Sequence, residues 1–309
     1  MAEPHGEVDD SDGDGMINLH EFWAGTDPLT PDGSNTLLSV CARSVDDRIL
    51  NSLGRLPINL YVDYSSNGMN GIFLKNTNCW SYGIDFSCAS MWHDGPAFNP
   101  DCHPTNTAVT AITPRHVIYA NHFGYAMNTN LLYCFRGEDG VVYTNRLVRF
   151  TGISNDIGIG LLETDLPESV HPAKFLPDDF AEYLGRGALL PVVTVEQNEC
   201  SVIHDLVCFT SWLNSSELMM TKSSIIGQRG CYAKSFIGGD SSSPRFLVVG
   251  NQVVLLGTLW KGGGGAGCHA NLFKDLIQRT INQFCPGYQI EEIDLSAFQK
   301  LKVQGGVDE

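Results

Sequence analysis

The chain is short of positive charge, with 19 Lys and Arg against 35 Asp and Glu and a net charge of −16. It therefore carries no basic footprint of the kind that nucleic-acid-binding proteins show. It has no run of apolar residues long enough for a membrane-spanning helix. It also has no Cys-x-x-Cys pair, which argues against a zinc ribbon or a thioredoxin-like site. We see no signal peptide, because the first residues form no apolar stretch.

Hydrophobic residues make up 43% of the 309 residues, which is enough for a complete core. An even number of cysteines in a glycine-rich chain favours disulfides and an oxidising compartment. We therefore expect a secreted or cell-envelope protein whose signal was removed or belongs to a larger parent chain. A metal site is the alternative for one cysteine-rich stretch, but the spacing fits no common zinc pattern. That stretch holds Cys79, Cys88, His93, Cys102 and His103, and the other cysteines are Cys41, Cys134, Cys200, Cys208, Cys231, Cys268 and Cys285.

Short apolar runs separated by turn residues fill the chain from about residue 107 onward. Their lengths and their Val, Ile, Tyr and Phe content predict β-strands of an all-β barrel or sandwich. Residues 138–140 and 250–251 are typical of hairpin turns. One helix is predicted at residues 271–284, where apolar side chains recur at helical spacing. The predicted strands are 108–112, 116–120, 130–135, 141–150, 157–162, 188–195, 206–212, 246–249 and 253–260.

The composition divides the chain into four parts. Residues 1–35 hold nine acidic residues and no Lys or Arg, which indicates a bound cation. Residues 36–75 are expected to form a linker or an N-terminal extension. Residues 76–285 contain the predicted strands and helix and form the main domain. Residues 286–309 are expected to form a loose C-terminal tail, and the chain shows no internal repeat.

The acidic head contains one complete calcium-loop pattern, D-x-D-x-D-G-x5-E, which begins at Asp10. Ca²⁺ binds about six to eight oxygens, and carboxylates at alternate positions supply several of them from one side. The segment resembles the half EF-hand loops of dockerin-like and thrombospondin-type-3-like repeats, which implies a structural Ca²⁺ and a docking partner for this segment. A flexible acidic leader is the alternative. The expected ligands are Asp10, Asp12, Asp14, Met16 through its carbonyl, Asn18 and Glu21.

Three segments further along the chain carry candidate catalytic side chains. They are residues 112–123 around His122, residues 155–162 with Asp156 near the start, and Gly-Gly-Asp-Ser-Ser-Ser-Pro at 238–244 around Ser241. In this order they resemble the trypsin-like, chymotrypsin-fold serine proteases over roughly residues 105–285. The resemblance implies two six-stranded antiparallel β-barrels with a C-terminal helix, preceded here by the calcium loop. It also implies a secreted serine endopeptidase that acts on protein or peptide substrates.

A serine hydroxyl is a weak nucleophile and needs a base within hydrogen-bond reach. The resemblance makes Ser241 the nucleophile, His122 the base and Asp156 the carboxylate that fixes the imidazole tautomer. It places the oxyanion hole at the backbone N–H groups of Gly239 and Ser241. It further implies a disulfide between Cys231 and Cys268 and a substrate pocket whose neutral floor favours apolar or aromatic side chains. The pocket residues are Ser235, Trp260 and Gly262, and the rivals for the catalytic roles are His116, Asp165 and Asp205.

The sequence departs from that family next to the nucleophile. Ser242 and Ser243 stand where the family has two glycines. No Ile-Val-Gly-Gly activation site precedes the strands, so Asp240, which in the family pairs with a freed N-terminus, needs another partner. These departures keep two alternatives open: a protease-like binding module without catalysis, and a calcium-anchored extracellular scaffold protein.

Overall fold

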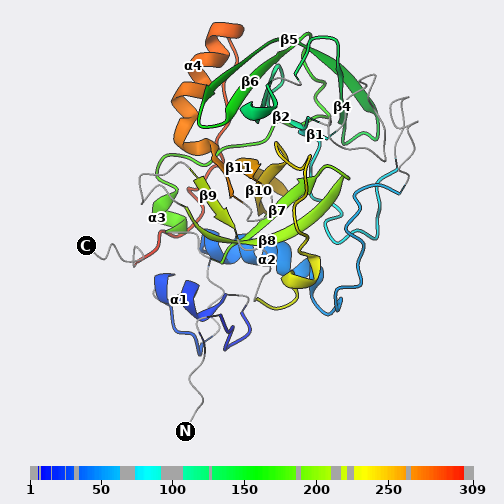
Figure 1. Cartoon of the computed structure of the whole chain (residues 1–309). Coiled ribbons are helices and arrows are strands. Elements are labelled where there is room, and N and C mark those ends of the chain that lie inside the picture. The colour runs from blue at the N-terminus through cyan, green and yellow to red at the C-terminus, as the bar shows by residue number, and fades with distance from the viewer. Residues whose placement is uncertain are drawn as a thin grey trace.

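Antiparallel strands dominate this protein, in a computed structural model that describes most of the chain. The described residues are 6, 8–14, 16–24, 26–30, 35–62, 74–91, 107–124, 127–185, 189–209, 217–220, 226–261 and 266–302. Figure 1 shows two sheets one above the other, with helix α4 beside the upper sheet and helix α2 beneath the lower one. The β-rich prediction is therefore confirmed, and the fold is compatible with a chymotrypsin-like architecture.

The C-terminal half forms a closed antiparallel barrel in the strand order β10-β11-β12-β9-β8-β7. Pairing of β10 with β7 completes the closure, with Arg245 opposite Thr194 and Phe246 opposite Val193. The predicted turn at 250–251 joins β10 to β11, and Gly250 adopts a φ of 66° there. The strands are β7 Pro191–Glu196, β8 Cys200–Phe209, β9 Glu217–Met220, β10 Pro244–Val249, β11 Gln252–Lys261 and β12 Ala266–His269.

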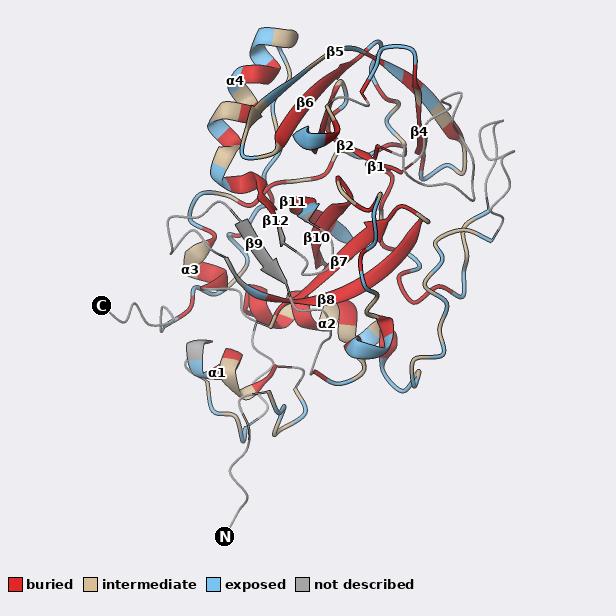
Figure 2. Cartoon of the chain, viewed as in Figure 1, coloured by how far each residue is buried: buried red, intermediate tan, exposed pale blue. Residues whose placement is uncertain are grey.

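The apolar runs of the barrel are continuous because both faces of these strands are buried (Figure 2). Successive side chains of a strand point to opposite faces. In β10, Phe246 and Val248 join the large core that the barrel shares with the N-terminal sheet, whereas Leu247 joins a second core against α2. In β11, Leu255 and Val254 divide between the two cores in the same way.

The N-terminal half forms a six-stranded antiparallel sheet in the order β1-β2-β3-β6-β5-β4. The end strands β1 and β4 touch, but no hydrogen-bonded ladder joins them among the described residues, so the predicted second barrel is not shown. The predicted turn at 138–140 joins β4 to β5, with Gly140 at a φ of 80°. The strands are β1 Ala89–Ser90, β2 Val109–Thr113, β3 His116–Ala120, β4 Leu132–Arg136, β5 Val142–Ser154 and β6 Ile157–Leu162.

Helix α2, Leu37–Ile49, occupies much of the segment that we expected to be a linker or extension. The Thr36 side chain caps it by accepting a hydrogen bond from the backbone N–H of Ser39. The predicted late helix is α4, Lys274–Phe284, preceded by a 3₁₀ turn, Ala270–Phe273. The other helices are α1 Asn18–Ala24 and α3 Ala181–Leu184. None of the helices among the described residues is long and apolar enough to span a membrane.

The C-terminal segment is not a loose tail over its described part, which ends at residue 302. Residue Glu292 bridges to Phe175, and Gln299 bridges to Thr36. Ile293 and Leu295 are buried in the core against α2. The tail prediction was wrong here because apolar residues spaced along an extended strap lack the period of a helix or a strand.

The predicted disulfides are not formed among the described cysteines. Cys231 is exposed and Cys268 is buried in the barrel, so the expected bond between them is not formed. A Cβ atom on Gly54 would lie 2.6 Å from the Cβ of Cys231, which shows that Gly54 lies directly against this cysteine. The candidate metal group at residues 79–103 is untested as a set, because His93, Cys102 and His103 lie outside the described residues.

Candidate active site and candidate calcium site

His122 and Asp156 lie together, as the sequence analysis predicted. The imidazole Nδ1 is 2.7 Å from Asp156 Oδ2, and the backbone N–H of His122 donates to Asp156 Oδ1 at 2.5 Å. The His122 side chain is 36% exposed, whereas the Asp156 side chain is 10% exposed. The carboxylate therefore holds one ring nitrogen from the protein side and leaves the other edge of the imidazole toward solvent.

Strand pairing explains this contact. Strand β3 pairs with β6 and not with β4, and the register sets Ala120 opposite Ile157. The residues that follow β3 therefore lie beside the turn that precedes β6. That turn is a two-residue hairpin loop, Asn155 and Asp156, with φ of 40° and 65°. Asn and Asp tolerate this left-handed conformation better than most residues, which fits the type I′ turn that two-residue hairpins prefer.

Ser241 lies in a tight double turn between Ile237 and Ser243. The N–H of Asp240 donates to the carbonyl of Ile237 at 3.2 Å, and the N–H of Ser243 donates to the carbonyl of Asp240 at 3.0 Å. Gly239 has a φ of +99°, a conformation that suits glycine. Within the described structure, the backbone N–H groups of Gly239 and Ser241 have no hydrogen-bond acceptor. Both are therefore free to donate to a ligand, as an oxyanion hole requires.

Asp240 finds its partners in the backbone. Its carboxylate accepts hydrogen bonds from the N–H of Ile237 at 2.6 Å and the N–H of Gln197 at 3.3 Å. The Gln197 side chain also donates to the carbonyl of Gly238 at 3.0 Å. Burial raises the pKa of Asp240 above its ordinary value, against the lowering effect of the Ile237 hydrogen bond. The turn around Ser241 is thus held without an N-terminal ammonium group.

Ser241 and His122 are not hydrogen-bonded to each other among the described contacts. The neighbouring residue nevertheless links their segments, because Ser242 Oγ accepts from the N–H of Ala120 at 2.9 Å. Ala120 ends β3, two residues before His122. Catalytic hydrogen bonds are often long before substrate binds, so this arrangement is compatible with a triad.

The substrate-pocket residues are placed only in part. Ser235 is exposed, Trp260 is 36% exposed near the end of β11, and Gly262 lies outside the described residues. A buried stack beside Ser235 was not evident from the sequence. There the Phe236 ring packs 4.6 Å from the His204 ring, and the Arg245 guanidinium lies 5.4 Å from the Phe236 ring. Phe236 directly follows Ser235, the predicted pocket floor, and His204 and Arg245 contact the Phe236 ring. No sequence motif marks these three residues.

The rivals for the catalytic roles are engaged elsewhere. His116 is fully buried, its Nδ1 is 2.9 Å from Thr113 Oγ1, and burial lowers its pKa to about 4. Asp205 is paired with buried Arg229. Asp165 accepts hydrogen bonds from Arg115 and Tyr288 at the surface (3.3 and 2.6 Å). None of the three is bonded to His122 or Ser241 in the described structure.

Three of the six expected calcium ligands are clustered. One carboxylate oxygen from each of Asp10, Asp12 and Asp14 lies within 4.8 Å of the others. The Asp12 Oδ2 and Asn18 Oδ1 oxygens are buried and accept no hydrogen bond from the described residues. Such oxygens suit a hard cation, so the residues present fit calcium.

The other expected ligands are placed less directly. Glu21 is fully buried but outside that cluster, and its Oε1 accepts from Thr26 Oγ1 at 3.4 Å. Met16, whose carbonyl was the expected ligand, buries its side chain in the core against α2. The loop is therefore anchored on the main domain through Met16.

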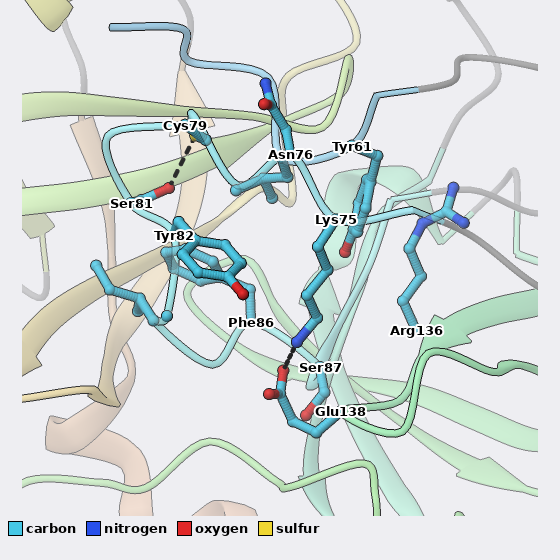
Figure 3. Close-up of a pocket in the computed structure, with 13 residues that line it drawn as sticks. Tyr61, Lys75, Asn76, Cys79, Ser81, Tyr82, Phe86, Ser87, Arg136 and Glu138 are labelled. Atoms are coloured by element: carbon cyan, nitrogen blue, oxygen red, sulfur yellow. Dashed lines mark hydrogen bonds and ion pairs between the residues drawn. The ribbon is translucent and has the colours of Figure 1, made fainter.

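The pocket in Figure 3 is separate from the candidate active site. It lies between two stretches, residues 60–61 and 75–87, and the chain at the end of β4, where Lys75 and Glu138 form an ion pair. At its other side Cys79 Sγ lies 3.3 Å from Ser81 Oγ. Neither His122 nor Ser241 lines it, so it belongs to the scaffold around the sheet.

Comparison with known proteins identifies no family, so a functional assignment depends on the residues described above. No protein-family model matches the chain, and no curated protein matches its sequence.

Proposed function

We propose that the chain is a serine endopeptidase that hydrolyses peptide bonds through an acyl-enzyme. The observation that carries this proposal is the His122–Asp156 pair, since a carboxylate on Nδ1 leaves Nε2 as a proton acceptor. The turn around Ser241 supports it, because this turn is bonded to the strand that leads to His122. The unpaired N–H groups of Gly239 and Ser241 support it further.

In the proposed reaction, Ser241 Oγ attacks the peptide carbonyl carbon while His122 Nε2 accepts the hydroxyl proton. The N–H groups of Gly239 and Ser241 stabilise the oxyanion, a contribution of about 3 kcal/mol per donor. His122 then gives its proton to the leaving amine as the C–N bond breaks. Water attacks the resulting ester, with His122 again as base, and releases the acid and free Ser241. Asp156 stays ionised and stabilises the imidazolium.

A fluorophosphonate probe tests the proposal, because it phosphonylates only an activated serine. We expect the full chain to be labelled at Ser241. Ser241→Ala should abolish labelling with an unchanged circular-dichroism spectrum, whereas Ser243→Ala, two residues further on in the same turn, should not. A folded wild-type chain that fails to react, with calcium present, refutes the enzyme.

The same experiment decides between the proposal and a protease-like binding module without catalysis. The missing hydrogen bond between Ser241 and His122 in the described structure favours that alternative. A binding module would show no labelling and would still hold peptides. For an active enzyme, the uncharged Ser235 at the proposed pocket floor and the exposed Trp260 ring favour apolar or aromatic substrate side chains, which a panel of fluorogenic peptides would rank.

We also propose an accessory Ca²⁺ at Asp10, Asp12 and Asp14, with Asn18, Glu21 and the Met16 carbonyl as further ligands. When bound, Ca²⁺ supplies charge neutralisation for these carboxylates. The clustered oxygens and the anchoring of Met16 in the core support a structural role. A calcium-anchored scaffold would share this site but not the labelling of Ser241. A secreted or cell-envelope location remains a proposal, and localising the tagged protein in its native cells would test it.

A further inference from the structure

Ser242, the residue after the proposed nucleophile, makes more hydrogen bonds than a turn requires. Ser242 is fully buried and has a φ of 74°, a conformation that favours glycine. Its hydroxyl donates to the carbonyl of Ala108 at 2.6 Å and accepts from the N–H of Ala120 at 2.9 Å. Its own N–H donates to the carbonyl of Leu259 in β11 at 2.8 Å. Ser242 therefore ties the barrel to strand β3 and to the residue that precedes strand β2 in the N-terminal sheet.

The contact with Ala120 belongs to a continuous series of hydrogen bonds. The N–H groups of Ala120, Asn121 and His122 are three consecutive donors. The first donates to Ser242 Oγ, the second to the carbonyl of Asp156 at 2.8 Å, and the third to Asp156 Oδ1 at 2.5 Å. One end of the series is next to the nucleophile, and the other end is the base itself.

We propose that Ser242 is a positioning residue, whose hydroxyl sets the separation between Ser241 and His122. This inference rests on the proposed protease function. A side chain is needed for this link, and a glycine at this position could not supply it. The unfavourable φ of Ser242 persists because the two hydrogen bonds of its hydroxyl over-determine the conformation. An error of about 1 Å between reacting groups can cost about 100-fold in rate.

Ser243 provides a matched control in the same turn. It is also fully buried, but its Oγ has no hydrogen-bond partner among the described residues. Ser243→Ala therefore removes a buried hydroxyl without breaking a bond between the two halves. Ser242→Ala removes the hydroxyl and keeps a side chain at the unfavourable φ, whereas Ser242→Gly removes both.

The experiment measures fluorophosphonate labelling of the full-length variants at 25 °C, as the saturating rate and the half-saturating concentration over a range of pH. We expect Ser242→Ala and Ser242→Gly to lower the saturating rate by about 10- to 100-fold. The half-saturating concentration and the pH midpoint should not change, because the His122–Asp156 pair remains. Ser243→Ala should label within twofold of wild type.

Hydrogen exchange of the Ala120 amide gives a second readout that needs no activity. We expect faster exchange at Ala120 in both Ser242 variants and unchanged exchange in Ser243→Ala. A loss of labelling confined to Ser242→Ala would assign the effect to backbone strain and overturn the proposal. Wild-type labelling rates in folded Ser242 variants, or unchanged Ala120 exchange, would also overturn it. A wild-type chain that never labels refutes the proposed function instead, and faster Ala120 exchange would then leave Ser242 only a structural link.

Discussion

Replacing Asp156 by Asn tests which ring nitrogen of His122 carries the proton in the proposed mechanism. Asp156 accepts two hydrogen bonds, one from the backbone N–H of His122 and one from its ring Nδ1. An asparagine has one oxygen to accept both. The backbone N–H can only donate, so it keeps the oxygen, and the amide NH₂ then faces Nδ1. The ring must accept there and carry its proton on Nε2, where it cannot take the proton of Ser241.

The expected loss is large because the variant keeps the shape of the site and reverses the tautomer. We expect the fluorophosphonate labelling rate to fall about 10⁴-fold, the loss that a wrong tautomer causes in a serine-protease triad. This loss corresponds to about 5.5 kcal/mol of transition-state stabilisation. The assay is the second-order labelling rate near neutral pH, on variants with a wild-type circular-dichroism spectrum.

Asp165→Asn is the matched control, since Asp165 also accepts two hydrogen bonds, here from the Arg115 and Tyr288 side chains, but is not bonded to His122. It should label at the wild-type rate. Labelling of Asp156→Asn within tenfold of wild type would refute the assignment of the tautomer, and with it the role of Asp156.

Three further predictions concern stability. Arg229→Met removes the guanidinium that faces the buried Asp205 carboxylate and should lower the free energy of unfolding by about 3–5 kcal/mol; a urea titration measures this, and a loss below 1 kcal/mol would contradict it. Calcium at about 100 times its Kd should stabilise the fold by about 2.7 kcal/mol, an effect that a chelator or Asp12→Asn removes; a melting temperature indifferent to calcium would speak against the site. Burial holds three histidine pKa values near 4 in the folded chain, so protons bind the unfolded chain first as the pH falls. The three histidines therefore cost no stability above about pH 6.5. Between pH 6.5 and 4, the free energy of unfolding should fall by about 1.4 kcal/mol per pH unit for each histidine. Equal urea midpoints at pH 7 and pH 5 would exclude this effect. These histidines are His116, His204 and His269.

Local features were predictable because they depend on neighbours along the chain. The β3 and β6 strands have the predicted bounds, and α4 ends at the predicted residue. The turns at Gly140 and Gly250 follow from residues that tolerate a positive φ. Helix α2 was missed although its signal was present: Leu37, Leu38, Cys41 and Val45 recur at helical spacing after the cap at Thr36.

Pairing between distant segments was not predictable from periodicity. An alternating pattern reports that a strand is buried, but it does not report which strand lies beside it. The pairing of β3 with β6 decides that Asp156, and not Asp165 or Asp205, meets His122. The family resemblance led to the same pair, whereas the residues alone left these rivals open.

The sequence by itself determined strands such as β3 and β6, the turns at Gly140 and Gly250, the late helix and the candidate side chains, because each depends on propensity and spacing over a few residues. Only the tertiary structure decided that a single barrel is closed among the described residues, that the described cysteines form no disulfide with one another, and that Ser242 joins the two halves. These outcomes depend on contacts between residues far apart in the chain. Such contacts form where burial and hydrogen bonding of the whole molecule offset the entropy of closing long loops, and no short window of sequence records that balance.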